Sequence, residues 1–290
     1  MTSPFTGQVF SFLGASLVLG AVYAWTLFWV FLILCAALAF LGLIRILNRM
    51  ADRLPAQVAH PIHWIHALAF EGFAVAATAF LHPVRYFSSQ RVGSPDGRPI
   101  LLIHGYLHDS SAWVYHKRQL RKEGFGPIYV LNLGHPFRSI RHYAEKVKMK
   151  AEQIERETNR SDLILIGHSM GGLVSSWYAM RLAPPGKVTD VITIGSPLAG
   201  TYVAKIGIGP PAREMERDSE LLEELREKIK KSAHTRFFHI ATKTDQLVIP
   251  YSSALVGGHL ERQYLLEDVG HVTLLFSPRV AKKISDWLRN

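Results

Sequence analysis

The chain has 290 residues, a formal net charge of +10 and a hydrophobic content of 48%, which is high for a soluble protein. This length allows one large domain or two small ones. The single cysteine, Cys35, excludes an intrachain disulfide, which suits a cytosolic domain.

The amino-terminal segment accounts for the excess of apolar residues. No charged residue occurs before Arg45, and nearly every residue from Val9 to Ile44 is apolar. This run exceeds the about 20 residues that one membrane-spanning helix needs, so residues 1–54 are predicted to be a transmembrane region. One long tilted helix and a hairpin of two spans both fit, and we favour two. A cleaved signal peptide is disfavoured because Met1 to Phe5 lack a basic region.

Three arginines follow this apolar run at once: Arg45, Arg49 and Arg53. Positive residues mark the cytoplasmic flank of a membrane span, and both span counts place this flank in the cytosol. We therefore expect the chain to be membrane-anchored, with the remaining residues facing the cytoplasm.

Residues 55–87 contain a second apolar stretch, from Pro61 to Leu81, which is interrupted by His63, His66 and Glu71. Ionisable residues make a membrane span costly. This segment is therefore predicted to be a helix that lies on the bilayer or packs against the following domain, rather than a third span.

Residues 88–97 are rich in glycine, serine and proline and are predicted to form a linker ahead of a domain over residues 98–290. Basic residues are spread through this domain and the membrane flank. No nucleic-acid-binding motif and no interleaving of aromatic and basic residues accompanies them, so we expect no nucleic-acid partner. Anionic lipid headgroups match a membrane-tethered chain better, since each basic residue near a bilayer contributes about 1 kcal/mol.

A G-x-S-x-G pattern carries the clearest chemical signal within residues 98–290. The apolar run Leu163 to Ile166 predicts a buried strand, Gly167 to Gly171 follow at once, and helix-forming spacing continues from Leu173 to Met180. A serine at the tip of such a strained strand-to-helix turn is a nucleophile elbow. Ser169 is therefore the predicted nucleophile.

A serine hydroxyl is a poor nucleophile at neutral pH and needs a histidine base that is oriented by an acid. In chain order the acid and the base follow the serine. The predicted strand Arg236 to Ala241 leads into Asp245, and the predicted strand Gln263 to Leu266 leads into His271. We predict that Asp245 is the acid and that His271 is the base.

Other aspartates and histidines compete for these roles. Asp190 precedes its predicted strand and so lies at the wrong end of the sheet, and Asp218 falls in a predicted charged helix. Asp268 is too close to His271 along the chain for the side-on contact of an orienting carboxylate. His259 is the main rival base, and its alternative interpretation is a solvated loop residue.

Acyl transfer also needs two backbone N–H groups to stabilise the developing oxyanion, each worth about 3 kcal/mol. One is predicted to be the amide of Met170, directly after the nucleophile. The other is predicted to be the amide of Tyr106, which follows the apolar strand Pro99 to Ile103, with Gly105 permitting close backbone approach. His168 is interpreted as a packing or hydrogen-bonding residue.

These motifs together resemble the α/β-hydrolase superfamily, and within it bacterial triacylglycerol lipases and esterases and the GPI-inositol deacylase-like group. The resemblance covers about residues 98–290 and rests on His104 to Tyr106, Gly167 to Gly171, Gly195 to Thr201, Asp245 with Pro250 to Ser253, and Gly270 with His271. It implies an α/β-hydrolase fold, a mostly parallel sheet with helices on both faces. It also implies Ser169, Asp245 and His271 as a catalytic triad, Tyr106 and Met170 as the oxyanion hole, and no cofactor.

One segment departs from the pattern of secreted lipases of this type, which usually have Pro-His-x-Gly where this chain has Pro197-Leu198-Ala199-Gly200. The sequence also lacks their disulfide and a clear set of calcium-binding aspartates. We therefore expect no metal.

Residues 198–235 form the main insertion of the domain. Within it, Glu214 to Lys231 are predicted to form one helix with an apolar face that contains Leu221, Leu222, Leu225 and Ile229. A mobile lid and a helix that caps the core both fit this pattern.

The sequence predicts a membrane-anchored serine hydrolase that cleaves carboxylic esters through an acyl-enzyme. Because a membrane tether brings the enzyme close to lipids, we expect these esters to be lipid esters. An acyltransferase with the same triad would differ only in that an alcohol replaces water. His104 and Asp109 form an H-x4-D pattern like that of glycerolipid acyltransferases, although His104 is already needed at the oxyanion loop. A non-catalytic membrane scaffold would show a broken triad, whereas this one is complete.

Overall fold

The computed structural model describes residues 61–82, 91–257 and 259–290. The chain divides into two compact units between Arg53 and Leu54, and every described residue belongs to the second. The predicted transmembrane region over residues 1–54, its number of spans and its orientation lie outside the described residues.

In the part of the chain that the structure describes, six parallel strands form one sheet in the order β2-β1-β3-β4-β5-β6. The strands are β1 (Ile100–Ile103), β2 (Ile128–Leu131), β3 (Leu163–His168), β4 (Val188–Ile194), β5 (Arg236–Thr242) and β6 (Gln263–Leu266). β1 and the first four residues of β3 are continuous apolar runs, as expected for strands that are buried on both faces. Their carboxyl ends meet at one edge of the sheet, where the predicted site residues follow β1, β3, β5 and β6.

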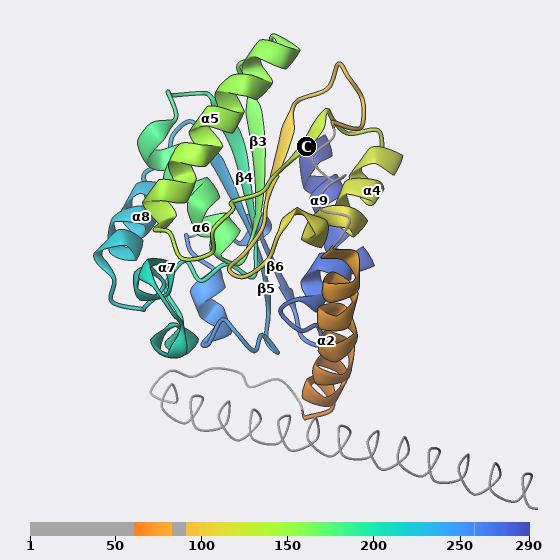
Figure 1. Cartoon of the computed structure of the whole chain (residues 1–290), viewed down its shortest axis with the longest axis vertical. Helices are drawn as coiled ribbons and strands as arrows, with labels where there is room; N and C mark the ends of the chain where they lie inside the picture. Colours follow the sequence, from red (N-terminus) through yellow and green to blue (C-terminus); the bar gives the residue numbers. More distant parts are fainter. Residues whose placement is uncertain (1–60, 83–90, 258) are drawn as a thin grey trace, which may run out of the picture. The chain divides into compact units, whose positions relative to one another are not determined.

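Helices cover both faces of this sheet (Figure 1). One face packs against α5 (Ile140–Thr158), α6 (Met170–Trp177) and α8 (Glu220–Lys230), and the other against α4 (Val114–Lys122) and α9 (Pro278–Arg289). Strand residues alternate between the two cores, with Leu101 and Ile103 on the α5 side and Ile100 and Leu102 on the α9 side. The predicted fold class, a parallel sheet with helices on both faces, is confirmed.

Local capping explains where these helices begin. Ser139 precedes α5, and its hydroxyl accepts a hydrogen bond from the His142 amide at 3.1 Å. Ser277 caps α9 in the same way and is followed by Pro278, whose missing N–H costs nothing in the first turn. The apolar stripe of α9 ends in Trp287 and Leu288 against the sheet.

The insertion departs from its prediction. The single helix expected from Glu214 to Lys231 is wrong in its first turn, because the chain forms a short helix α7 (Pro210–Glu214), then turns, and resumes as α8 at Glu220. Ser219 causes the break, since its hydroxyl donates to the carbonyl of Glu214 at 2.7 Å and its oxygen caps the new helix at Leu222.

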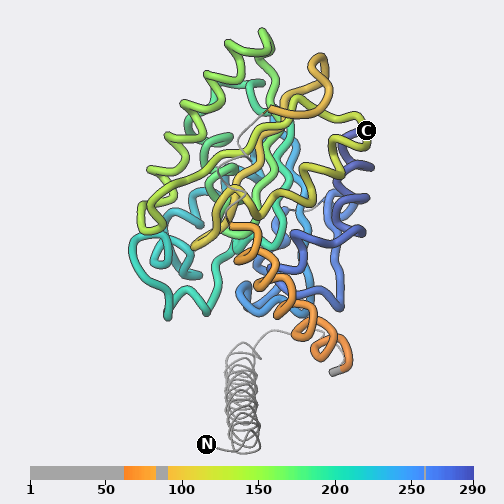
Figure 2. The backbone as a smooth tube through the Cα atoms, turned by 45° about the vertical axis from the view of Figure 1, so that its right-hand side comes forward, coloured from red at the N-terminus to blue at the C-terminus, as the bar shows by residue number. Residues whose placement is uncertain are grey.

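The apolar stretch ahead of the sheet is the helix α2 (Pro61–Leu81). Within the described residues, Ile62–Leu81 is the one segment that is long and apolar enough, by length and composition alone, to cross a membrane. Ala67 and Ala74 of α2 are buried, and the helix packs against the helical turns η2 (Ser110–Trp113) and η7 (Thr273–Phe276). Figure 2 follows α2, in orange, alongside the carboxyl-terminal part of the chain, in blue.

The described part of the predicted linker also contacts the sheet. Val92 forms an antiparallel bridge with Ile128 of the edge strand β2, with N···O distances of 3.3 and 2.7 Å. The chain from Arg91 onward therefore runs along the edge of the sheet before it enters β1.

Candidate active site

Ser169 lies at the tip of a strained turn between β3 and α6. Its backbone adopts φ 55° and ψ −127°, a region that residues with a side chain rarely occupy. Strain of this kind persists only where the surroundings enforce it, and it is frequent at functional sites. Ser169 is partly exposed, whereas its neighbours His168 and Met170 are buried.

Glycines make this turn possible. A Cβ on Gly171 would overlap the carbonyl oxygens of Ile103 and His104, so only glycine lets α6 begin this close to β1. A Cβ on Gly105 would lie 2.9 Å from Cβ of Ser169. The loop after β1 therefore passes directly beside the serine.

Asp245 and His271 form a buried pair beside this turn. Nδ1 of His271 lies 2.9 Å from both carboxylate oxygens of Asp245, and both residues are almost fully buried. Oδ1 of Asp245 also accepts hydrogen bonds from the amides of Leu247 at 2.8 Å and Val248 at 2.7 Å. A carboxylate only accepts, so Nδ1 of His271 carries the proton and Nε2 of the neutral ring is left as a base.

The charge of Asp245 sets the basicity of His271. Burial alone would lower the pKa of His271, but the charge and hydrogen bond of Asp245, together with the charge of Glu71, more than offset it. The pKa of His271 is therefore raised above its ordinary value of 6.5. A raised pKa makes the ring a stronger proton acceptor once it is neutral.

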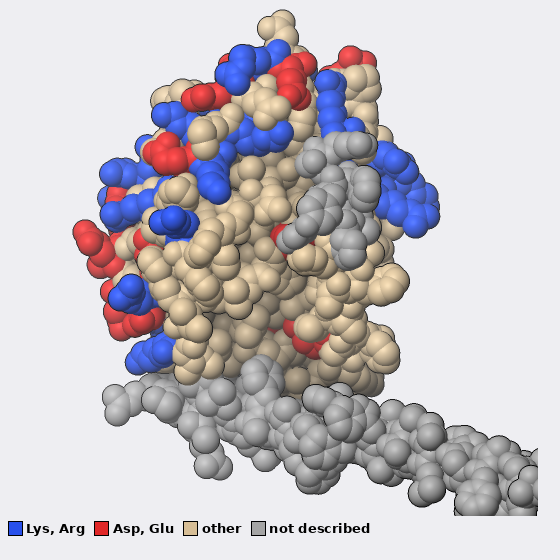
Figure 3. Space-filling model, viewed as in Figure 1, with Lys and Arg blue, Asp and Glu red and all other residues tan. Residues whose placement is uncertain are grey.

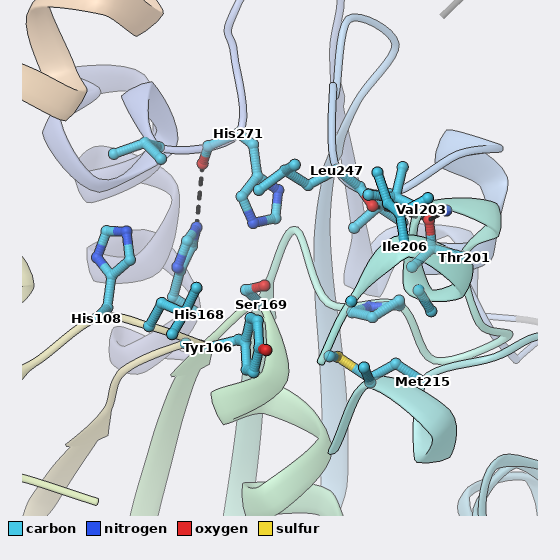
Figure 4. A pocket seen from close by; sticks show the side chains of 18 of the residues that line it. Tyr106, His108, His168, Ser169, Thr201, Val203, Ile206, Met215, Leu247 and His271 are labelled. Carbon is cyan, nitrogen blue, oxygen red and sulfur yellow. Dashed lines mark hydrogen bonds between the residues drawn. The ribbon is translucent and has the colours of Figure 1, made fainter. Parts of the chain in front are cut away.

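Two further side chains hold the backbone of His271. Oε1 of Gln246 accepts from the His271 amide at 3.0 Å, and Nε2 of His168 donates to the His271 carbonyl at 3.0 Å, the dashed line in Figure 4. Burial and the nearby rings of His271 and His108 lower the pKa of His168 well below 6.5, so it stays neutral. His168 is thus a hydrogen-bonding residue, whereas the role of Gln246 was not anticipated from the sequence.

A cavity of about 440 Å³ opens in front of Ser169 and His271. In Figure 4 the His271 ring points toward Ser169. The walls are mainly apolar and include Val203, Ile206, Met215, Leu247, Val248 and Val272. Such a space suits an apolar ligand whose polar end lies at the serine.

The two predicted oxyanion donors flank the same serine. Met170 follows it as the first residue of α6, and Tyr106 follows Gly105 and lines the cavity. The Tyr106 hydroxyl donates to the carbonyl of Ile208 at 2.8 Å and so ties this loop to the insertion.

Residues 100–255, more than half of the chain, match the family model described as the alpha/beta hydrolase family. The chain belongs to this family.

Solved structures with the same fold include lipases. Aspergillus fumigatus lipase B shares 19% identity at a TM-score of 0.59 over 68% of this hydrolase, and the match covers 54% of that lipase, about half of its length. The mature form of a Bacillus licheniformis lipase shares 18% identity at a TM-score of 0.58, over 69% of this chain and 96% of that one. A bromoperoxidase from Bacillus anthracis shares 12% identity at a TM-score of 0.53, over 69% and 94%. The hydrolase therefore resembles lipases and esterases, on a fold that also carries other chemistry.

The rival residues lie elsewhere in this hydrolase. His259 is two-thirds exposed beside Glu261 and does not line the cavity, and Asp268 pairs with Arg279 at 2.6 Å. Asp190 lies near the start of β4, at the opposite end from the cavity, where its carboxylate accepts from Arg98 and Arg236.

The residues of the H-x4-D pattern are engaged separately. Nε2 of His104 accepts from the Leu133 amide at 2.9 Å, and burial lowers its pKa. Asp109 instead caps the turn η2 by accepting from the Ser111 amide at 2.8 Å. This arrangement gives the pattern a structural use in the hydrolase.

The insertion has two parts with different surroundings. Leu222 and Leu225 of α8 are fully buried, and each such side chain contributes about 2 kcal/mol to folding, so α8 caps the core. The preceding segment, from Thr201 to Met215, lines the cavity. The lid prediction therefore applies to residues 201–215 and not to α8.

His108, which the sequence did not single out, also faces the cavity. Burial, together with the nearby rings of His271 and His104, lowers the pKa of His108 to about 4, so it is neutral at physiological pH. Among the residues that the structure describes, no group of three or more metal-ligating side chains lies close enough to bind an ion.

Proposed function

We propose that this hydrolase is a membrane-anchored serine ester hydrolase that cleaves carboxylic esters of lipids through an acyl-enzyme. One observation carries the proposal: a serine strained to positive φ lies at the floor of an apolar cavity, beside a histidine that is hydrogen-bonded to a buried aspartate.

In the proposed mechanism, Nε2 of His271 takes the proton of the Ser169 hydroxyl as its oxygen attacks the ester carbonyl. Asp245 stabilises the imidazolium that forms. The amides of Tyr106 and Met170 donate to the negative oxygen of the tetrahedral intermediate. His271 then protonates the departing alcohol, and a second cycle with water releases the acid and frees Ser169.

Two features support a lipid substrate. The cavity walls are apolar, which favours an acyl chain over a polar group. The helix α2 exposes several large apolar side chains, including Phe73 at 74% and Phe80 at 85%, and its Val75 lines the cavity. Exposed apolar side chains gathered on one helix are typical of membrane or partner contact.

The distribution of basic residues gives less support to membrane contact through α2 than the apolar side chains do. On the face drawn in Figure 3, Lys and Arg gather toward the end of the domain away from α2, whose surroundings carry few charges. We therefore base the membrane proposal on the apolar segments, over residues 1–54 and on α2. Attraction to anionic headgroups and a cytoplasmic catalytic domain stay predictions.

The test is turnover of a panel of p-nitrophenyl esters and phospholipid vesicles by the full-length protein, with Ser169→Ala and the matched control Ser252→Ala. Ser252 is exposed and lies outside the cavity. We expect hydrolysis by the wild type and the control, and none by Ser169→Ala. Added glycerol distinguishes acyl transfer, because a transferase would form glycerol esters in place of free acid.

A further inference from the structure

A carboxylate from outside the predicted catalytic domain is hydrogen-bonded to the loop that carries His271. Glu71 lies in the middle of α2, and its Oε1 accepts from the Val272 amide at 2.7 Å. Its Oε2 accepts from the Thr273 amide at 3.0 Å and from the Thr273 hydroxyl at 2.8 Å. The two residues that follow His271 are thus hydrogen-bonded to one side chain.

The loop lies close against this carboxylate. A Cβ on Gly270 would lie 2.2 Å from Oε2 of Glu71, so a larger residue at this position would displace the carboxylate. Gly270 and Val272 flank His271 on both sides. Glu71 therefore contacts the chain immediately before and immediately after the base.

Other contacts fix α2 along its length. Near its start, Nδ1 of His63 lies 3.9 Å from Glu267, and near its end Nε2 of His82 lies 3.3 Å from Asp109. Val75, one turn after Glu71, lines the cavity. The helix is thus in contact with the catalytic domain at three heights, with Glu71 at the centre.

The hydrogen bonds of Glu71 indicate a role in turnover as well as in packing. An acid in an apolar helix is costly unless its charge is satisfied, and here two amides and a hydroxyl satisfy it with charge-assisted hydrogen bonds. A displacement of about 1 Å in a catalytic group costs about 100-fold in rate. An anchor on both sides of His271 is therefore placed to control turnover.

We propose that Glu71 is a positioning residue for the reaction, which holds the loop 270–273 so that His271 faces Ser169, and that α2 is in this way part of the active site. The inference rests on the proposed function, because it assigns Glu71 a role only through His271.

A pH profile separates positioning from simple support. The groups that face His271 are Asp245 after β5, Glu71 on α2, His168 at the end of β3 and His108 after β1. Both histidines stay neutral because burial lowers their pKa. The two carboxylates raise the pKa of His271, so removing the charge of Glu71 lowers it, and the rising limb of kcat/KM moves to lower pH.

The experiment uses the full-length protein in detergent, with active sites counted by fluorophosphonate labelling of Ser169. Glu71→Gln and Glu71→Ala are expected to lower kcat per labelled site by about 10- to 100-fold, with KM for a short p-nitrophenyl ester within about threefold. Glu71→Gln should also shift the rising limb to lower pH. Glu71→Asp keeps the charge and should keep the limb while kcat falls.

Asp268→Asn is the matched control, since this acid precedes the same loop but pairs with Arg279, and we expect kcat within about twofold of the wild type. If the Glu71 variants only reduce the number of labelled sites, while kcat per site and the pH limb are unchanged, Glu71 merely supports the fold and the proposal is overturned. A wild type that neither labels at Ser169 nor cleaves esters would instead overturn the proposed function, and the role of Glu71 with it.

Discussion

The elbow at Ser169 and the loop at His271 are the two halves of the candidate site, and they are built in opposite ways. The elbow is encoded in a contiguous segment, a buried strand, a glycine-flanked serine and a helix start. The loop is held by side chains that are far away in the sequence. Gln246 lies 25 residues from its hydrogen-bond partner, His168 lies 103 residues from its partner, and Glu71 lies 201 residues from its partner. The candidate nucleophile is thus specified locally, whereas the position of the candidate base depends on the whole fold.

The largest expected effect concerns Asp245, the candidate acid, which is hydrogen-bonded to His271. Asp245→Asn should lower kcat/KM by about 10⁴-fold, because the amide can donate to Nδ1 and so favours the wrong tautomer of His271. Ester turnover at saturating and limiting substrate measures this. A loss in Asp268→Asn that equals or exceeds the loss in Asp245→Asn would mean that the orienting acid has been misplaced.

A steric clash at the elbow should be enough to destabilise the fold. Gly171→Ala places a Cβ against the carbonyls of Ile103 and His104, so we expect a loss of at least about 3 kcal/mol in the free energy of unfolding. Urea denaturation followed by fluorescence measures it. Gly72→Ala on α2 is the matched control, because its Cβ meets nothing within 4 Å, and it should be neutral or slightly stabilising. Equal stability of the two variants would argue against the close approach of α6 and β1.

Truncation distinguishes tethering from site assembly. Removing residues 1–54 should lower activity on bilayer substrate by about tenfold or more while short-ester activity stays within about threefold, since a tether acts on access alone. Removing residues 1–87 also removes Glu71 and Val75, so both activities should fall together. Assays of both proteins on vesicles and on p-nitrophenyl butyrate provide the comparison. Full short-ester activity without α2 would show that the helix is dispensable for the chemistry.

The smallest effect is the position of the pH profile. The pKa of His271 is raised, so the ring is protonated and inactive as a base below it and becomes competent as pH rises through it. The rising limb of kcat/KM in the wild type should therefore lie above pH 6.5, the ordinary value for histidine. Initial rates across a pH series measure the limb, and one centred clearly below 6.5 would contradict the net effect of the two carboxylates.

The same contrast explains what the sequence could predict. The strand β3, the turn at Ser169 and the terminal helix α9 are signalled by contiguous residues, and so is the parallel sheet with helices on both faces. The break before α8 depends on one hydrogen bond from Ser219 and was missed. The contacts of Glu71 and Gln246 with the His271 loop could not be predicted, since no local pattern links residues on α2 or after β5 to that loop. The single acid in the mostly apolar helix α2 is the one local signal that could have indicated a partner for Glu71.

The central claim is that His271 activates Ser169, and the rate at which a fluorophosphonate modifies Ser169 tests it most directly. Mass spectrometry should locate the adduct on Ser169, and the second-order rate should fall by at least about 10³-fold in His271→Ala while His259→Ala stays within about tenfold. An adduct on another residue, or a labelling rate in His271→Ala equal to that of the wild type, would contradict the account.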